Sequence, residues 1–268
     1  KLFSAEPVID ILVNNKIFGE RRKEAKDLKE FLPEGVTPET ATDEDIKKAK
    51  KTKKAQAEYD KAMKCYKEAL PRYEKSDDKI ADVARTYCKV GEIYEKQSEY
   101  DKSMEYFEKA LSMQVKEFGT EEHVDVGETY ARMGWTCSRK RKDDQAMEYF
   151  QKSLKIRLKV LDEGHVDVGA SYHYVGNVFW RQNEFDEALE YYNKSLDIRI
   201  NKLGKDHTDV ALTYYNIGAL YYNQSKYKEA LECFNKSYNI WKDKLGDDHE
   251  DTKDALRMIQ RCKYRLGM

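Results

Sequence analysis

Four of the five histidines recur at one phase of the chain, a spacing that could build a row of metal ligands. An aspartate stands two positions after each of them, and neighbouring members are 42 residues apart: His123, His165, His207 and His249. Zinc ligands must all reach one ion at about 2 Å, whereas equivalent positions in successive repeated helices lie at least about 10 Å apart. We therefore expect these residues to fold a loop and cap a helix near its positive end, and we predict no metal site.

Other arrangements that could do chemistry are missing from the sequence. It holds no glycine-rich phosphate loop, no zinc-protease helix motif and no nucleophile elbow. Carboxylates are abundant, but pairs such as Asp186-Glu187 recur with the repeat and are typical of a solvated charged face. We predict that the protein is not an enzyme, with no catalytic residue, no cofactor and no small-molecule substrate.

Charge and hydropathy exclude further classes of function. The 268 residues carry 49 Lys plus Arg against 50 Asp plus Glu, a net charge of −1 that disfavours nucleic acid as a partner. The longest apolar runs are about six residues, far short of the roughly 20 that span a bilayer. Five dispersed cysteines without a C-x-x-C pair indicate a reduced protein. We expect a cytoplasmic location, with cytoskeletal association left open, and a chain cut from a longer protein.

A repeat of 42 or 43 residues organises the chain after residue 81. Each unit has a glycine, a small residue twelve positions later and an aromatic residue four positions after that. This spacing predicts a shorter helix A followed by a longer helix B. Glycine inside a helix costs about 1 kcal/mol relative to alanine, so its recurrence indicates close packing, with the small residue as the expected matching surface. The glycines are Gly91, Gly134, Gly176 and Gly218.

Helix pairs of this kind bury both of their faces only by stacking on one another. We expect residues 1–42 to form an N-terminal helical extension or cap, and residues 43–81 a degenerate first repeat. Its first helix is predicted over Asp43–Ala57, and its second begins near Tyr59. Residues 82–250 supply four repeats, and residues 251–268 a C-terminal capping helix.

The connection between units reads Leu-Gly-Lys-Asp-His-Thr-Asp-Val over 203–210 and Leu-Gly-Asp-Asp-His-Glu-Asp-Thr over 245–252. Over residues 58–266 the pattern resembles the tetratricopeptide repeat, and in particular the 42-residue repeats of kinesin light chains. The resemblance implies an all-α fold, a right-handed superhelical solenoid of antiparallel helix pairs with helical caps. It also implies a protein-binding role, although such repeats occur in signalling receptors, ciliary proteins and bacterial scaffolds as well.

In stacked helix pairs the A helices line the inner, concave face. Exposed aromatic and arginine side chains are common where binding free energy is concentrated. The alternative is that Trp135 and Trp180 wedge between neighbouring A helices and belong to the core. The predicted peptide-binding groove comprises Arg132, Trp135, Arg139, His173, Asn177, Trp180, Arg181, Tyr215, Asn216, Tyr222 and Asn223.

Such a groove suits an extended protein or peptide partner with apolar anchors and acidic flanks, whose carboxylates the arginines would hold. Kinesin light chains take cargo peptides of this type partly through paired asparagines. Only Asn216 of that pair is present here, because Tyr215 precedes it, so cargo identity does not carry over. A scaffold or cargo adaptor is the favoured function. The alternatives are the sensor arm of a larger signalling ATPase or receptor, and an architectural subunit of a ciliary or cytoskeletal assembly.

One basic tract lies outside the repeats. Six of the eight residues from Lys47 to Lys54 are lysines, and Asp43, Glu44 and Asp45 precede them. The tract could attract acidic tails, anionic lipid or nucleic acid. Negative charge at the start of a helix and positive charge later also suits the helix dipole, so we favour a solvated end-cap helix.

Overall fold

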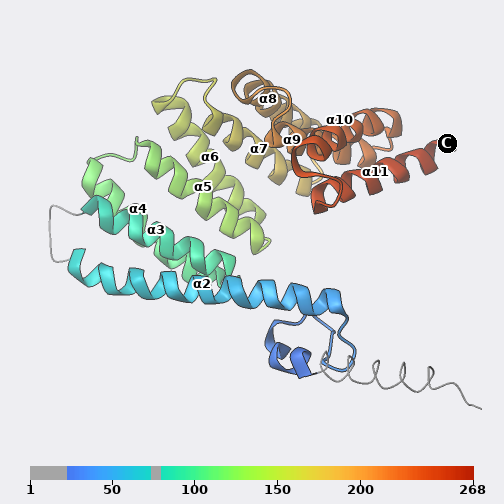
Figure 1. Ribbon diagram of the computed structural model, residues 1–268. Coiled ribbons are helices and arrows are strands. Elements are labelled where there is room, and N and C mark those ends of the chain that lie inside the picture. Colours follow the sequence, from blue (N-terminus) through green and yellow to red (C-terminus); the bar gives the residue numbers. More distant parts are fainter. Residues whose placement is uncertain (1–22, 74–79) are drawn as a thin grey trace, which may run out of the picture. The chain divides into compact units, whose positions relative to one another are not determined.

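The computed structural model describes residues 23–73 and 80–268. Throughout these two ranges the regular elements are helices, and no strand occurs. The chain divides into two units, one ending at residue 72 and one beginning at residue 73, and each is described by itself (Figure 1). The predicted all-α class is confirmed.

The first unit is a small helical assembly. Residues 23–27 are helical, η1 spans Lys29–Phe31, and α2 spans Asp43–Tyr73. At the start of α2, the backbone N–H of Asp45 donates to Oγ1 of Thr42 at 3.2 Å, and the N–H of Thr42 donates to the Asp45 carboxylate at 2.9 Å. This reciprocal pair caps the helix. The buried core comprises Ala25, Leu28, Ala41, Ile46 and Ala49.

Helix α2 runs without interruption over 31 residues, so the predicted break between Ala57 and Tyr59 is wrong. Glycine is absent from this stretch and Pro71 lies in the last turn, while alanine and lysine, both strong helix formers, dominate. The part of the predicted extension before residue 23 lies outside the described residues.

The lysines of the basic tract on α2 are all exposed. Lys48 pairs with Glu44 at 3.2 Å, and Lys50 pairs with Glu24 at 2.5 Å. Both pairs are solvent-exposed, and such pairs are worth at most about 1 kcal/mol. This environment is that of a solvated helix face.

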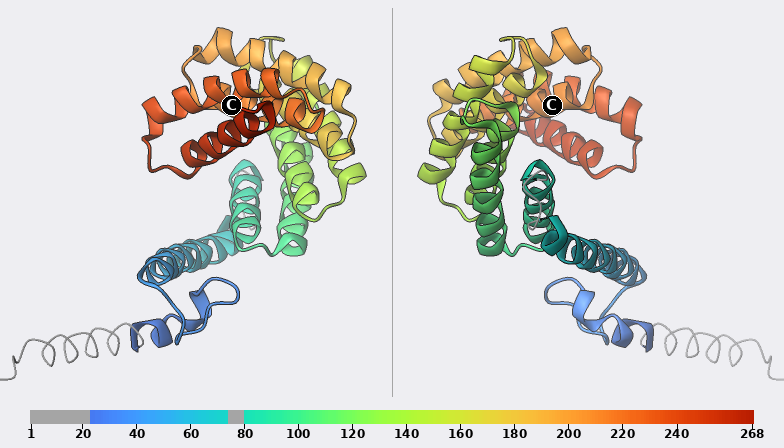
Figure 2. Two further views of the ribbon diagram at one scale, coloured as in Figure 1. Left: turned by 90° about the vertical axis from the view of Figure 1, so that its right-hand side faces the viewer. Right: turned by 90° about the vertical axis from the view of Figure 1, so that its left-hand side faces the viewer.

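The second unit is a row of helix pairs that begins with α3 (Ile80–Lys96) and ends with the single helix α11 (Glu250–Leu266). Each A helix packs on its own B helix, and each B helix packs on the next A helix, as Figures 1 and 2 show. The predicted solenoid of stacked pairs is confirmed. The remaining helices are α4 (Tyr100–Phe118), α5 (Val124–Arg139), α6 (Asp143–Val160), α7 (Val166–Arg181), α8 (Phe185–Leu203), α9 (Thr208–Asn223) and α10 (Tyr227–Leu245).

The repeated glycines mark close approach between the helices of a pair. A Cβ atom built on Gly134 would lie 2.6 Å from the ring of Phe150, and one on Gly176 would lie 2.9 Å from the ring of Tyr192. Both distances are shorter than a van der Waals contact, so the aromatic ring is the nearest partner. At Gly176 the backbone oxygen of Ala188, the small residue that the sequence suggests, also lies 3.4 Å from the added atom. The small residues are nevertheless fully buried: Ser103, Ala146, Ala188 and Ala230.

The four periodic histidines act as helix caps, as predicted. In each case Nδ1 accepts a hydrogen bond from the backbone N–H of the aspartate two positions later, at 3.1 Å for His207 and 3.3 Å for His249. The same bond is 3.2 Å long at His123 and 3.1 Å at His165. The arrangement satisfies one of the free N–H groups at the start of helices α5, α7, α9 and α11.

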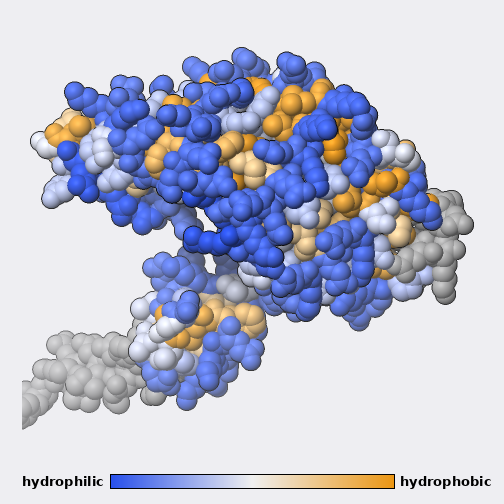
Figure 3. Space-filling view, turned by 180° about the vertical axis from the view of Figure 1, so that it is seen from behind, coloured by the Kyte–Doolittle hydropathy of each residue, from blue (hydrophilic) through white to orange (hydrophobic). Residues whose placement is uncertain are grey.

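The face seen in Figure 3 is mostly hydrophilic, with small scattered apolar patches. No helix in the two described ranges is both long and apolar enough to cross a bilayer. Over the same residues, no group of three or more histidines, cysteines and acids is arranged to hold a metal ion.

Candidate functional site

The predicted groove residues come together in the structure. All eleven line one or both of two adjoining cavities, with volumes of about 610 Å³ and 800 Å³. Trp135, Asn177 and Asn216 contribute to both cavities. The walls are built mainly from α5, α7 and α9, so the A helices do form the lining. We call the two cavities together the groove, the 610 Å³ one the first cavity and the 800 Å³ one the second cavity.

Helix α11 also borders the groove. Met258 and Arg261 line the second cavity, whereas the sequence predicts only a capping role for this helix. The start of α4 contributes Tyr100, and the turn after α5 contributes Arg141. Because the solenoid curves, helices that are distant in sequence reach one cavity.

The two groove tryptophans differ in environment. Trp135 is 39% exposed, although its ring approaches that of Tyr174 with centroids 6.1 Å apart. Trp180 is half-buried and packs on the apolar core around Ala188 and Ile217, and its Nε1 is shielded from solvent without a hydrogen-bond partner. Trp135 is therefore an open surface group, and Trp180 is largely part of the core.

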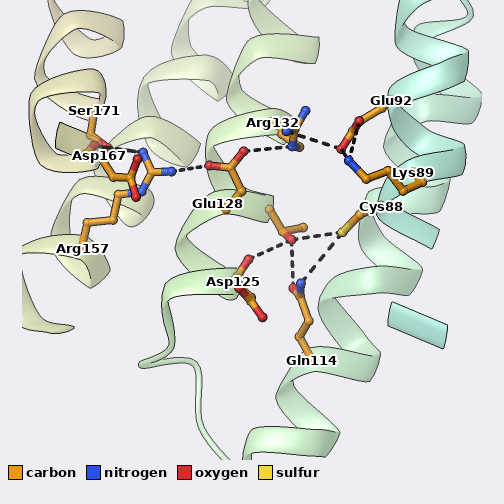
Figure 4. A network of polar contacts seen from close by, with 11 residues as sticks. Cys88, Lys89, Glu92, Gln114, Asp125, Glu128, Arg132, Arg157, Asp167 and Ser171 are labelled. Atoms are coloured by element: carbon orange, nitrogen blue, oxygen red, sulfur yellow. Dashed lines mark hydrogen bonds and ion pairs between the residues drawn. The ribbon is translucent and has the colours of Figure 1, made fainter. Parts of the chain in front are cut away.

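Two of the predicted carboxylate-binding arginines already have partners within the chain. Arg132 lies 3.0 Å from the carboxylate of Glu128 and 3.4 Å from that of Glu92, as Figure 4 shows. Arg181 pairs with Asp143 and donates to the backbone oxygen of Ser138 at 3.0 Å. Arg132 is thus paired with acids on its own helix and on α3, and Arg181 with an acid on α6. That either arginine also holds a carboxylate of a ligand stays a prediction.

Three other arginines line the second cavity without an acidic partner among the described residues. Arg139 is exposed and its Nε donates to the Tyr100 hydroxyl at 3.3 Å. Arg141 and Arg261 are exposed as well. With Arg181, the lining of the second cavity contains four arginines and no aspartate or glutamate. Arg181 is paired with Asp143, so the positive charge of this lining comes from Arg139, Arg141 and Arg261.

The floor of the groove is a buried polar network. The His173 side chain is buried, with Nε2 3.1 Å from Nδ2 of Asn216 and Nδ1 3.4 Å from Nη1 of Arg199. Asn216 also donates to Oδ1 of Asn177 at 3.2 Å, and the Tyr192 hydroxyl donates to the same oxygen at 2.7 Å. Burial, reinforced by the Arg199 charge, holds the pKa of His173 well below its ordinary value. The imidazole is thus a neutral structural group, where the sequence analysis expects a surface contact.

The remaining predicted residues come from α9. Tyr215 is half-buried, with its ring edge-on to Phe234 at 5.3 Å and tilted against Trp241 at 5.5 Å. Tyr222 is half-buried on Tyr227, and Asn223 is exposed at the end of the helix. Tyr222 and Asn223 are therefore accessible at the margin of the second cavity.

A family model described as tetratricopeptide repeat matches residues 82–159, 139–201, 167–243 and 209–268. The chain belongs to the tetratricopeptide repeat family. Such repeats generally serve as protein-interaction scaffolds, and the fold is generally non-enzymatic. No curated protein sequence matches the chain.

Solved structures with the same fold include BtubC (BKLC) from P. vanneervenii, with a TM-score of 0.66 and 18% identity over 79% of this chain and 84% of that one. Another is a putative kinesin light chain with nearly identical repeats from Podosopora anserina. Its TM-score is 0.58 and its identity 17%, over 68% of this chain and 86% of that one. The apo form of RapI has a TM-score of 0.63 and 21% identity, over 82% of this chain and 62% of that one. At these identities the likeness concerns the fold alone.

One position of the tetratricopeptide repeat unit bears on the groove and was missed by sequence reasoning. On the B helices of successive repeats it holds Gln114, Arg157, Arg199 and Trp241. All four side chains are buried. The last repeat has tryptophan at this position, which indicates that the position is buried. Arginine at the same position in two other repeats therefore predicts a buried arginine, and buried arginines are rarely without a polar partner.

Proposed function

We propose that residues 80–268 form a non-enzymatic scaffold or cargo adaptor that binds an extended segment of a partner protein in the groove. The observation that carries this proposal is the lining of the second cavity, where three arginines without an acidic partner among the described residues lie beside the exposed residue Trp135. Tryptophan and arginine are enriched among the residues that dominate binding free energy. A cytoplasmic partner is part of the proposal.

The chemistry of the partner follows from the same lining. Trp135 offers an apolar face for an anchor side chain, while Arg139, Arg141 and Arg261 offer charge to acidic flanks. Arginine pairs with carboxylates in a bidentate geometry that adds specificity as well as strength. We expect a segment with one or two apolar anchors and at least one acidic residue beside them.

A displayed library of random dodecapeptides tests this proposal with the purified chain. The clones that are enriched should carry acidic residues next to an aromatic or aliphatic one. Measured by fluorescence anisotropy on synthetic copies of those clones, Trp135→Ala combined with Arg139→Ala should weaken binding at least tenfold. Circular dichroism melts would show that this double variant remains folded.

A matched control removes one apolar and one basic side chain from α6, outside the groove. Lys155 and Leu158 are both exposed there, and neither lines the two cavities. Lys155→Ala combined with Leu158→Ala should leave the affinity within twofold of the unmodified chain. Equal losses in both double variants, or a library without any enriched acidic clone, would contradict groove binding and favour an architectural role through other surfaces.

A further inference from the structure

Arg157 and Arg199 occupy equivalent positions on α6 and α8. Both residues are buried, Arg157 with 2% and Arg199 with 5% of its surface exposed. Each reaches toward the start of the next A helix. Arg157 donates to the backbone oxygen of Asp167 at 3.1 Å and to Oγ of Ser171 at 2.9 Å. Arg199 donates to the equivalent oxygen of Asp209 at 3.0 Å and to Oγ1 of Thr213 at 2.7 Å.

The two guanidinium groups differ in their counter-ion. Nη2 of Arg157 pairs with the carboxylate of Glu128 on α5, which Figure 4 shows between Arg157 and Arg132. The position equivalent to Glu128 on α7 is Ala170. Among the described residues, no carboxylate forms an ion pair with Arg199, and no acceptor contacts its Nε or Nη2. Arg199 therefore lacks the counter-ion that the same repeat position has one unit earlier.

Nearby acids do not replace the counter-ion that Arg199 lacks. The Asp209 charge acts on Arg199 from the first turn of α9, but the equivalent Asp167 stands in the same place relative to Arg157. Glu128, which also borders the first cavity, is already shared by Arg157 and Arg132. A buried charge without a close partner is costly, and burial lowers the pKa of Arg199.

Arg199 borders the groove, although only 5% of the residue is exposed. Arg199 lines the first cavity together with Ala170, Leu212 and His173. Ala170 and Leu212 supply apolar walls that would contact the methylene groups of an inserted side chain. The whole cavity has a volume of about 610 Å³.

We propose that this part of the first cavity receives a glutamate or aspartate side chain of the bound segment, whose carboxylate pairs with Arg199 as Glu128 pairs with Arg157. This inference rests on the proposed function and specifies one residue of the partner. It assigns the acid a place between α7 and α9, separate from the arginines of the second cavity. Four acids also line the first cavity: Glu95, Glu128, Asp167 and Asp209. Selection of a carboxylate over the corresponding amide therefore depends on direct contact with Arg199, the one lining arginine that forms no ion pair with a described residue.

The direct test follows the Nε–H resonance of Arg199 by NMR in the complete 268-residue chain. The probes are N-acetyl-glutamate N-methylamide, the matching glutamine compound, and N-acetylglycine as a terminal carboxylate. Arg199→Met assigns the resonance. The glutamate compound should shift this resonance in a saturable way, with the other two probes giving less than a quarter of the shift. An equal shift from the glutamine compound would overturn the inference, and a larger shift from N-acetylglycine would replace the side-chain carboxylate with a chain terminus.

A second test supplies the missing carboxylate from within. Ala170→Glu recreates the Glu128 arrangement and should raise the melting temperature, whereas Ala170→Gln, of nearly the same size, should not. Ala170→Glu should also reduce the affinity of the library-selected peptides at least tenfold, because its own carboxylate takes the position of the partner's acid. If Trp135→Ala with Arg139→Ala abolishes binding while Ala170→Glu leaves it unchanged, the groove function stands and the Arg199 inference fails. If no peptide is selected, the groove function fails and the NMR titration alone decides for Arg199.

Discussion

The buried guanidinium of Arg157 on α6 pairs with the carboxylate of Glu128 on α5, and it also donates to the Asp167 carbonyl at 3.1 Å at the start of α7. One side chain thereby joins both helices of one repeat to the first helix of the next. In a solenoid, where each repeat contacts only its neighbours, such a residue contributes directly to the coupling between units. It also fixes Glu128 at the edge of the groove.

Replacing Glu128 with alanine should destabilise the chain by about 1–3 kcal/mol, because it leaves a buried cation without its strongest acceptor. Urea unfolding of the two proteins gives this difference in the free energy of unfolding. In an Arg157→Met background the same replacement should cost less than about 0.5 kcal/mol, since the charge to be neutralised is gone. Equal costs in the two backgrounds would show that the pair is not coupled.

The matched control for Glu128 is an exposed pair one helix away. Glu148 lies 2.7 Å from Lys152 on α6, with both side chains about half exposed. Glu148→Ala should change the free energy of unfolding by no more than about 0.5 kcal/mol, the usual range for exposed pairs four residues apart on a helix.

Substitution of Gly134 by alanine should destabilise the chain, although alanine is the better helix former by about 1 kcal/mol. The added Cβ would lie 2.6 Å from the Phe150 ring, and relieving that overlap costs about 1–3 kcal/mol. Urea unfolding of Gly134→Ala, and of the same variant with Phe150→Leu, would measure the loss and its partial recovery. Ser112→Ala, on the exposed face of α4, should have almost no effect. A stabilised Gly134→Ala variant would mean that the two helices can move apart freely.

The repeat period predicted the helix pairs and the placement of all eleven groove residues, because both depend on short-range spacing. Helical periodicity determines which side of helix A a residue occupies, and nearest-neighbour stacking turns that side into the lining of a groove. Residues such as Trp135 and Asn177 could be placed in this way without any knowledge of their contacts.

The ionic partners could not be predicted in the same way. Arg181 pairs with Asp143 of the preceding repeat, and Arg132 pairs with Glu92 of the preceding repeat. The pair of Arg132 with Glu128, four residues apart on α5, follows from local helical spacing. The partners contributed by other repeats do not, because periodicity does not constrain which side chains those repeats carry. The uninterrupted course of α2 was missed because similarity to the repeat outweighed helix propensity over residues 43–73.

Loss of a histidine cap should have a measurable but local effect. His207→Ala removes the acceptor for the Asp209 N–H, a bond of 3.1 Å, and should cost about 0.5–2 kcal/mol. Hydrogen exchange should speed up in the first turn of α9 and remain unchanged in α5. His207→Asn, which keeps a good capping side chain, should retain most of the protection. Uniform acceleration over the entire solenoid would contradict a local capping role.

The neutral state of His173 should make the stability of the chain fall in mild acid. Its pKa lies well below the ordinary value of 6.5, chiefly through burial and secondarily through Arg199, whose Nη1 is 3.4 Å away. Above pH 6.5 the imidazole is neutral in both the folded and the unfolded chain, so it does not make the free energy of unfolding depend on pH. Below pH 6.5 the unfolded chain binds a proton that the folded chain excludes, and stability falls by up to about 1.4 kcal/mol per pH unit until the folded pKa is reached.

The free energy of unfolding, measured in urea at pH 7.5, 6.5 and 5.5, should show this dependence on pH. His173→Gln should lower the slope below pH 6.5 by nearly the contribution of one proton, about 1.4 kcal/mol per pH unit. The other four histidines are partly exposed caps present in both proteins, so an unchanged slope in His173→Gln would show that His173 is not the group responsible.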